Sequence, residues 1–188
     1  SNQTTREMVL RGLSELHLRT ALEQLQARYR VELDTSKPSV AYRETVTTEP
    51  SGQHRHKKQT GGSGQYGRVV GYIEPCEEAD FEFVDKTKGG VIPKEFVSGV
   101  EKGVREGMEA GVLAGFPMVD IRVLLLDGST HEVDSSEMAF KVAGGMALKE
   151  AAKKAQPVLL EPVMDVEIVT PPEYMGDVNA DLSARRGQ

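Results

Sequence analysis

The chain of 188 residues is acidic and poor in aromatic residues, with 23 lysines and arginines against 29 aspartates and glutamates and a net charge of −6. Its single cysteine, Cys76, excludes an internal disulfide framework and the usual zinc ligand sets. No apolar run approaches the ~20 residues of a membrane helix, and the first residues lack the pattern of a secretion signal. We therefore expect a non-membrane protein of a reducing compartment, with one large domain or two small ones.

The first 47 residues predict a helix followed by two short strands. The apolar residues of the helix recur at steps of four, three and four: Leu18, Leu22, Leu25 and Tyr29. Ser14 stands where an N-cap is expected, and strands are expected at 31–34 and 40–46. Because such a unit is too small to close a core, we interpret it as the C-terminal part of a small α+β domain.

The middle of the chain predicts the order β, β, α, β, α, after a linker at 47–53. The expected elements are strands at 66–74, 81–84 and 119–126, and helices at 93–111 and 134–155. Asp134 and Glu137 have the spacing of a capping box at the start of the second helix, in which Met138 and Met146 are expected to be buried. This order is typical of an open α+β sandwich. A further strand is expected at 163–169.

The stretch 54–68 is basic and rich in glycine. No carboxylate occurs between Pro50 and Ile73, and this segment holds four cations: Arg55, Lys57, Lys58 and Arg68. Without these four the remaining charge is 19 − 29 = −10, so the positive charge is local. A basic, glycine-rich loop on an acidic body favours contact with a polyanion. A solvated loop between two domains is the alternative, and both interpretations stay open.

The candidate motifs for chemistry do not fit their required contexts. Residues 62–67 match G-x-G-x-x-G, but a strand is predicted after the glycines, where a dinucleotide site needs a helix. There is no G-x-x-x-x-G-K-[ST] loop. His54 and His56 lack neighbouring cysteines or carboxylates, so no metal site is expected. His131 is interpreted as an exposed turn histidine, and the sequence predicts no catalytic residue.

Several longer motifs, in collinear order along nearly the whole chain, resemble bacterial elongation factor G, a translational GTPase. These are residues 12–18, 37–45, 59–67, 88–93, 110–117, 131–140, 157–162 and 176–178. The resemblance implies that 1–47 end a ferredoxin-like domain III, that 48–158 form domain IV, and that 159–188 begin a ferredoxin-like domain V. Domain IV is implied to be a ribosomal-protein-like two-layer sandwich with a left-handed crossover.

The resemblance also implies a function. The parent protein would move tRNA and mRNA through the ribosome, with domain IV entering the decoding centre. GTP and Mg²⁺ would bind in a G domain that is missing here, so we expect no cofactor and no GTPase activity in this fragment. The implied tip of domain IV consists of Gly61, Gly62, Ser63, Gly64 and Gln65 with Ser129, Thr130, His131 and Glu132. His131 is expected to be foremost.

The expected partners are small-subunit rRNA, tRNA and mRNA, met by a cytoplasmic monomer without membrane contact. The sequence departs from the usual family pattern at Thr130, at Glu132 and in the acidic segment 76–80. These departures leave open an alternative, a paralogue of elongation factor G that acts in ribosome recycling or ribosome protection.

Overall fold

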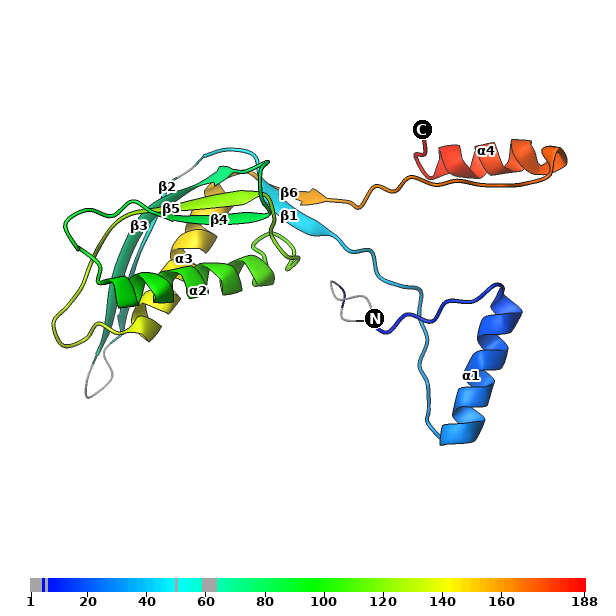
Figure 1. Ribbon diagram of the computed structural model, residues 1–188, viewed down its shortest axis with the longest axis horizontal. Coiled ribbons are helices and arrows are strands. Elements are labelled where there is room, and N and C mark those ends of the chain that lie inside the picture. Colours follow the sequence, from blue (N-terminus) through cyan, green and yellow to red (C-terminus); the bar gives the residue numbers. More distant parts are fainter. Residues whose placement is uncertain (1–4, 6, 50, 59–63) are drawn as a thin grey trace.

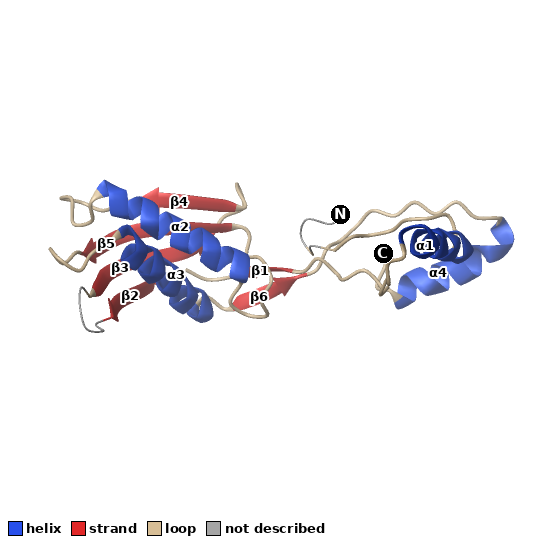
Figure 2. Ribbon diagram, turned by 90° about the horizontal axis from the view of Figure 1, so that it is seen from below, coloured by secondary structure: helices blue, strands red, loops and turns tan. Residues whose placement is uncertain are grey.

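The computed structural model describes residues 5, 7–49, 51–58 and 64–188, with the backbone alone for 51–58. Its body is a two-layer α+β sandwich, and two extended arms leave the body on one side (Figure 1). The sheet has the order β2-β3-β5-β4, formed by β2 (Ser51–Lys58), β3 (Gln65–Pro75), β5 (Ile121–Ser129) and β4 (Phe81–Asp85). Helices α2 (Lys94–Ala110) and α3 (Glu137–Lys154) cover one face of this sheet (Figure 2). The α+β sandwich expected from the sequence is confirmed.

The sheet combines a hairpin with a crossover. Strands β2 and β3 pair antiparallel, as do β3 and β5, whereas β4 and β5 are parallel because α2 connects them. The ladder between β3 and β5 shifts its register between Val70 and Gly71. A Cβ atom at Gly71 would overlap the carbonyl oxygen of Leu124, so this bulge requires glycine.

The core lies between the sheet and the two helices. Its largest fully buried apolar side chains are those of Phe140, Ile73, Ile121 and Leu125. The two helices approach each other through glycines: a Cβ atom at Gly103 would overlap the carbonyl oxygen of Lys141. Glycines in both helices allow this close packing, since a Cβ atom at Gly144 of α3 would likewise overlap the carbonyl oxygen of Val100 in α2.

A two-stranded ribbon stands at the base of the sandwich. Strand β1 (Arg43–Val46) pairs antiparallel with β6 (Pro157–Leu160), and the two arms continue from it (Figure 1). The arms carry α1 (Glu15–Tyr29), η1 (Pro172–Tyr174) and α4 (Met175–Ala184), none of which has a buried residue. Ser14 caps α1 as predicted, because its side chain accepts a hydrogen bond from the N–H of His17 at 3.2 Å.

Three strand predictions were wrong. Residues 51–58, expected as the end of a linker and a basic loop, form the edge strand β2, so the middle order is β, β, β, α, β, α. Charged side chains are typical of an edge strand. Because they replace the alternating apolar residues on which the strand predictions were based, β2 was not predicted. Residues 31–34 and 163–169 are not strands. Most residues of both segments are exposed, and β propensity gives a strand only where another strand is available for pairing.

The start of α3 also differs from its prediction. Ser136 is the N-cap, since its side chain accepts from the N–H of Ala139 at 3.2 Å, so Asp134 lies outside the helix. The buried face of α3 consists of small residues around Phe140, whereas Met138 and Met146 are exposed. The prediction that Met138 and Met146 are buried was wrong, because the close approach of α2 favours alanine and glycine over methionine.

Candidate nucleic-acid interface

Two turns that lie far apart in the sequence meet at one end of the sandwich. The N–H of Gly64, just before β3, donates to Oδ1 of Asp134 at 2.9 Å. The N–H of Tyr66 donates to the backbone carbonyl of Asp134 at 2.8 Å. A Cβ atom on Gly64 would lie 3.0 Å from that carboxylate, so glycine permits the close approach. Asp134 therefore joins the two turns, a role that the capping-box interpretation missed.

Tyr66 and Ser135 form hydrogen bonds that support the histidine turn, residues 129–132. The hydroxyl of Tyr66 lies 3.0 Å from Oγ of Ser129, and the hydroxyl of Ser135 donates to the carbonyl of Tyr66 at 2.9 Å. The N–H of His131 donates to Oγ of Ser135 at 2.8 Å. The rings of Tyr66 and His131 have centroids 6.0 Å apart and are tilted by 53°. Sequence reasoning missed the roles of Tyr66 and Ser135.

The geometry of His131 fixes which of its nitrogens can meet a ligand. Nδ1 lies 3.3 Å from the N–H groups of both Val133 and Asp134 and accepts from them. In the neutral ring the proton is then on Nε2, an assignment made from this hydrogen-bond pattern. The side chain is 54% exposed. His131 therefore offers one N–H donor to a partner.

The described residues of the predicted tip lie at the end of the sandwich opposite the ribbon. Thr130, His131 and Glu132 are exposed in the yellow-green loop between β5 and α3, and Ser129 and Gln65 are partly buried behind them (Figure 1). Gly61, Gly62 and Ser63 lie outside the described residues. Of the predicted tip, the structure thus brings together Gly64 and Gln65 with residues 129–132.

The predicted basic flank divides into two parts. Arg55, Lys57 and Lys58 belong to the edge strand β2, where their Cα atoms pair with those of Arg68, Tyr66 and Gln65. Arg68 on β3 forms an ion pair with Asp127, with 3.5 Å between Nη1 and Oδ2. Because this carboxylate balances its charge, Arg68 is a weaker attractant for a polyanion than the sequence indicated.

A further loop, residues 86–92 between β4 and α2, lies at the same end. Its buried Ile92 occupies the space where a Cβ of Gly128 would be, which places the loop next to the end of β5 (Figure 1). Gly89 and Gly90 have φ of 68° and 69° with nothing within 4 Å of their Cβ positions. Lys86 and Lys88 are exposed. Sequence reasoning used this loop as a break between elements and as a family motif at 88–93, but it did not include Lys86 or Lys88 in the basic flank.

The described residues contain no candidate metal centre. Among them no group of three or more histidines, cysteines, aspartates and glutamates is placed to hold a metal ion. Cys76 is buried. In the described part of the chain no helix is both long and apolar enough to cross a membrane. The described residues at this end of the sandwich combine hydrogen-bond donors with nearby cations.

Comparisons with known proteins identify the family of the chain. Residues 38–156 match the family described as "Elongation factor G, domain IV", and residues 158–188 match "Elongation factor G C-terminus". Elongation factor G of Aquifex pyrophilus is 53% identical over 97% of this chain, and that of Thermotoga maritima is 52% identical over all of it. A crystal structure of a protein from Thermus thermophilus has a TM-score of 0.86 at 45% identity, covering 98% of this chain and 28% of that one.

The chain belongs to the elongation factor G family. It spans 26% and 28% of the length of the Aquifex and Thermotoga relatives. Petrotoga mobilis contributes another relative with the name elongation factor G, 54% identical over 98% of this chain. Nothing in these matches favours the paralogue alternative.

Proposed function

We propose that this chain is the ribosome-contacting part of a GTP-dependent translocation factor. Residues 1–47 would end domain III, 48–158 would form domain IV, and 159–188 would begin domain V. GTP and Mg²⁺ would be bound by other parts of the parent, so this chain would contribute no GTPase chemistry. The observation that carries the proposal is the hydrogen-bonded union of Gly64 and Asp134, which makes one exposed tip of two turns.

The tip suits RNA because of its hydrogen-bonding groups. RNA helices present 2′-hydroxyls and base edges in a wide, shallow minor groove, and single-stranded bases expose further edges. Nε2 of His131 and the side chains of Gln65 and Thr130 can donate to these groups, and the backbone of 61–64 can approach closely because it is rich in glycine. We expect small-subunit rRNA, tRNA and mRNA as the partners of a cytoplasmic, monomeric factor.

Charge would assist this contact only locally, because the whole chain is acidic. Arg55, Lys57 and Lys58 belong to the edge strand β2, and Lys86 and Lys88 to the loop after β4, so two cationic segments would stand near the tip. Five phosphate contacts correspond to a salt slope of roughly −3.5 to −4.5, at about 0.7 to 0.9 for each phosphate. We therefore expect weak RNA binding by this chain alone, with most of the parent's affinity supplied by its other domains.

The work of the tip would be mechanical: it would occupy a site that tRNA and mRNA must leave. The test replaces His131 with alanine in the full-length parent and measures translocation and GTP turnover separately. We expect slower translocation with unchanged GTP turnover. Lys149→Ala, on an exposed position of α3, is the control and should change neither rate. Loss of GTP turnover with normal translocation would contradict the proposal.

A further inference from the structure

Glu44 on β1 is a carboxylate with 0% of its surface exposed. It accepts four backbone hydrogen bonds from the loop that joins α2 to β5. Oε2 accepts from Val112 at 2.7 Å and Leu113 at 2.9 Å. Oε1 accepts from Ala114 at 2.7 Å and Phe116 at 3.0 Å. A buried charge is costly unless it is fully hydrogen-bonded, and these four N–H groups meet that requirement.

The loop is shaped around this carboxylate. Gly111 begins it with φ of 67°, and a Cβ there would lie 2.8 Å from Oε1 of Glu44 and would overlap the carbonyl oxygen of Phe116. Gly115 has φ of 85°. Successive N–H groups that converge on one point form a concave anion site, and glycines permit the required turns. The loop therefore has the geometry of an anion-binding nest that is already filled.

The charge state of Glu44 agrees with this geometry. Burial alone raises the pKa of the carboxyl, but the four backbone hydrogen bonds outweigh burial and hold the pKa below its ordinary value. Within the described part of the chain, no cationic side chain forms an ion pair with Glu44. The dipoles of the loop amides thus stabilise the negative charge.

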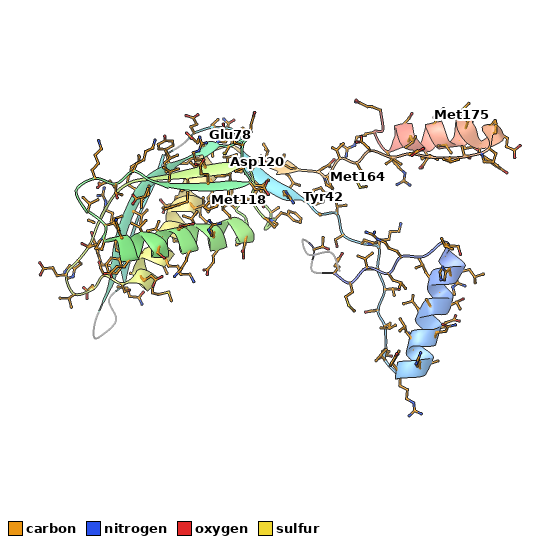
Figure 3. All side chains as sticks on the ribbon, in the orientation of Figure 1. Tyr42, Glu78, Met118, Asp120, Met164 and Met175 are labelled. Atoms are coloured by element: carbon orange, nitrogen blue, oxygen red, sulfur yellow. The ribbon has the colours of Figure 1, made fainter. Side chains whose placement is uncertain are left out.

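Glu44 stands where the ribbon meets the sandwich. Its N–H donates to the carbonyl of Pro117 at 2.9 Å, and its carbonyl accepts from the N–H of Val119 at 2.9 Å. On its other side Glu44 pairs with Leu159 of β6. Figure 3 shows Tyr42 and Met118 at this junction. Glu44 is therefore part of the ribbon and also contacts the sandwich, through both its backbone and its side chain.

We propose that loop 111–116 is an anion-binding nest for a carboxylate, with Glu44 as its built-in ligand, and that this contact fixes the sandwich on the β1–β6 ribbon. The inference does not depend on any contact with RNA. It predicts that a nest emptied by mutation accepts a small free carboxylate such as formate.

The test uses the 188-residue chain with Glu44→Ala and follows the thermal midpoint Tm in sodium formate and in sodium chloride of equal ionic strength. We expect a lower Tm that formate restores with saturation and chloride does not. Glu109→Ala, at an exposed position near the end of α2, is the matched control and should show no selective response to formate. A normal Tm in Glu44→Ala, or equal recovery in both salts, would overturn the proposal.

Glu44→Gln keeps the size of the side chain and removes its charge, so it tests the nest if the alanine variant fails to fold. Amide hydrogen exchange is the readout. We expect the exchange of Val112, Leu113 and Ala114 to be at least tenfold faster than in the parent chain, with the core strand β5 less affected. Unchanged protection of these amides in Glu44→Gln would rule out the charged nest.

Discussion

Asp134 accepts a hydrogen bond from the backbone N–H of Gly64 at 2.9 Å, although the two residues are 70 positions apart in the sequence. The same aspartate lies near His131, with 3.6 Å between Oδ2 and Nδ1. The position of the histidine turn therefore depends on a carboxylate that also contacts the glycine turn. Changes at Asp134 should affect both turns together.

Asp134→Ala should loosen the tip and lower the free energy of unfolding. A hydrogen bond to a charged group contributes about 1.5 to 3 kcal/mol, and partial exposure places this one at the lower end, about 1.5 to 2 kcal/mol. Asp134→Asn keeps an acceptor oxygen and should lose less. Urea denaturation of the 188-residue chain measures both variants. Equal losses for alanine and asparagine would mean that the hydrogen bond to Gly64 contributes nothing.

Gly103→Ala should destabilise the sandwich although alanine is the better helix former. A Cβ atom at this position would overlap the carbonyl oxygen of Lys141, and overpacking costs about 1 to 3 kcal/mol or more. Gly176→Ala in α4 is the matched control, because nothing lies within 4 Å of its Cβ position. That change should be neutral or slightly stabilising, by up to ~1 kcal/mol. Thermal unfolding should show a lower Tm for Gly103→Ala and no decrease in Tm for Gly176→Ala.

Replacing both Lys86 and Lys88 with alanine should weaken RNA binding without altering sequence preference. Two lost phosphate contacts should reduce the salt slope by about 1.4 to 1.8. The control pair is Lys153 and Lys154, which are exposed in the last turn of α3 beside the ribbon. A titration of RNA against salt concentration measures all three proteins. If the control pair lowers the slope as much as the loop pair, charge at the tip has no special role.

Glu44 should make stability depend on pH in one direction. Because the pKa of Glu44 is lowered in the folded state, the native chain binds fewer protons here than the unfolded chain. The stabilisation is therefore complete above the ordinary carboxyl pKa of 4.5 and is lost as the pH falls through the folded value. The difference in unfolding free energy between the parent chain and Glu44→Gln should be constant near pH 7 and shrink below about pH 4.5. A difference that grows on acidification would contradict this assignment.

The parts of the fold that sequence could predict depend on nearby residues. Ser14 caps its helix through an N–H only three residues away, and Gly111 ends α2 with the positive φ that favours glycine. The edge strand β2 was missed because its partner, and not its own apolar pattern, makes it a strand. Likewise, Met138 and Met146 of α3 were wrongly expected to be buried, because the glycines of α2 bring the two helices so close that small residues are favoured between them.

The same limit applies to the candidate site. The resemblance to the family named the two turns, but the residues that join them were assigned other roles or none. Asp134 carries a helix-cap pattern, and Tyr66 stands in an ordinary strand. The sequence did not predict the burial of Glu44, because its partners are four backbone N–H groups, and backbone groups have no sequence pattern of their own. Long-range polar contacts of this kind become visible only in three dimensions.

The pairing of β1 with β6 means that the polypeptide enters and leaves the sandwich through two adjacent strands. Arg43 is paired with Leu160, so the two ends of the intervening segment are already side by side. A segment with neighbouring ends can be excised, or inserted into a loop of a host protein, without a long connector. We therefore expect residues 43–160 to be transferable as one unit. Inserting this unit into a host protein would allow the properties of the tip to be measured apart from the rest of the factor.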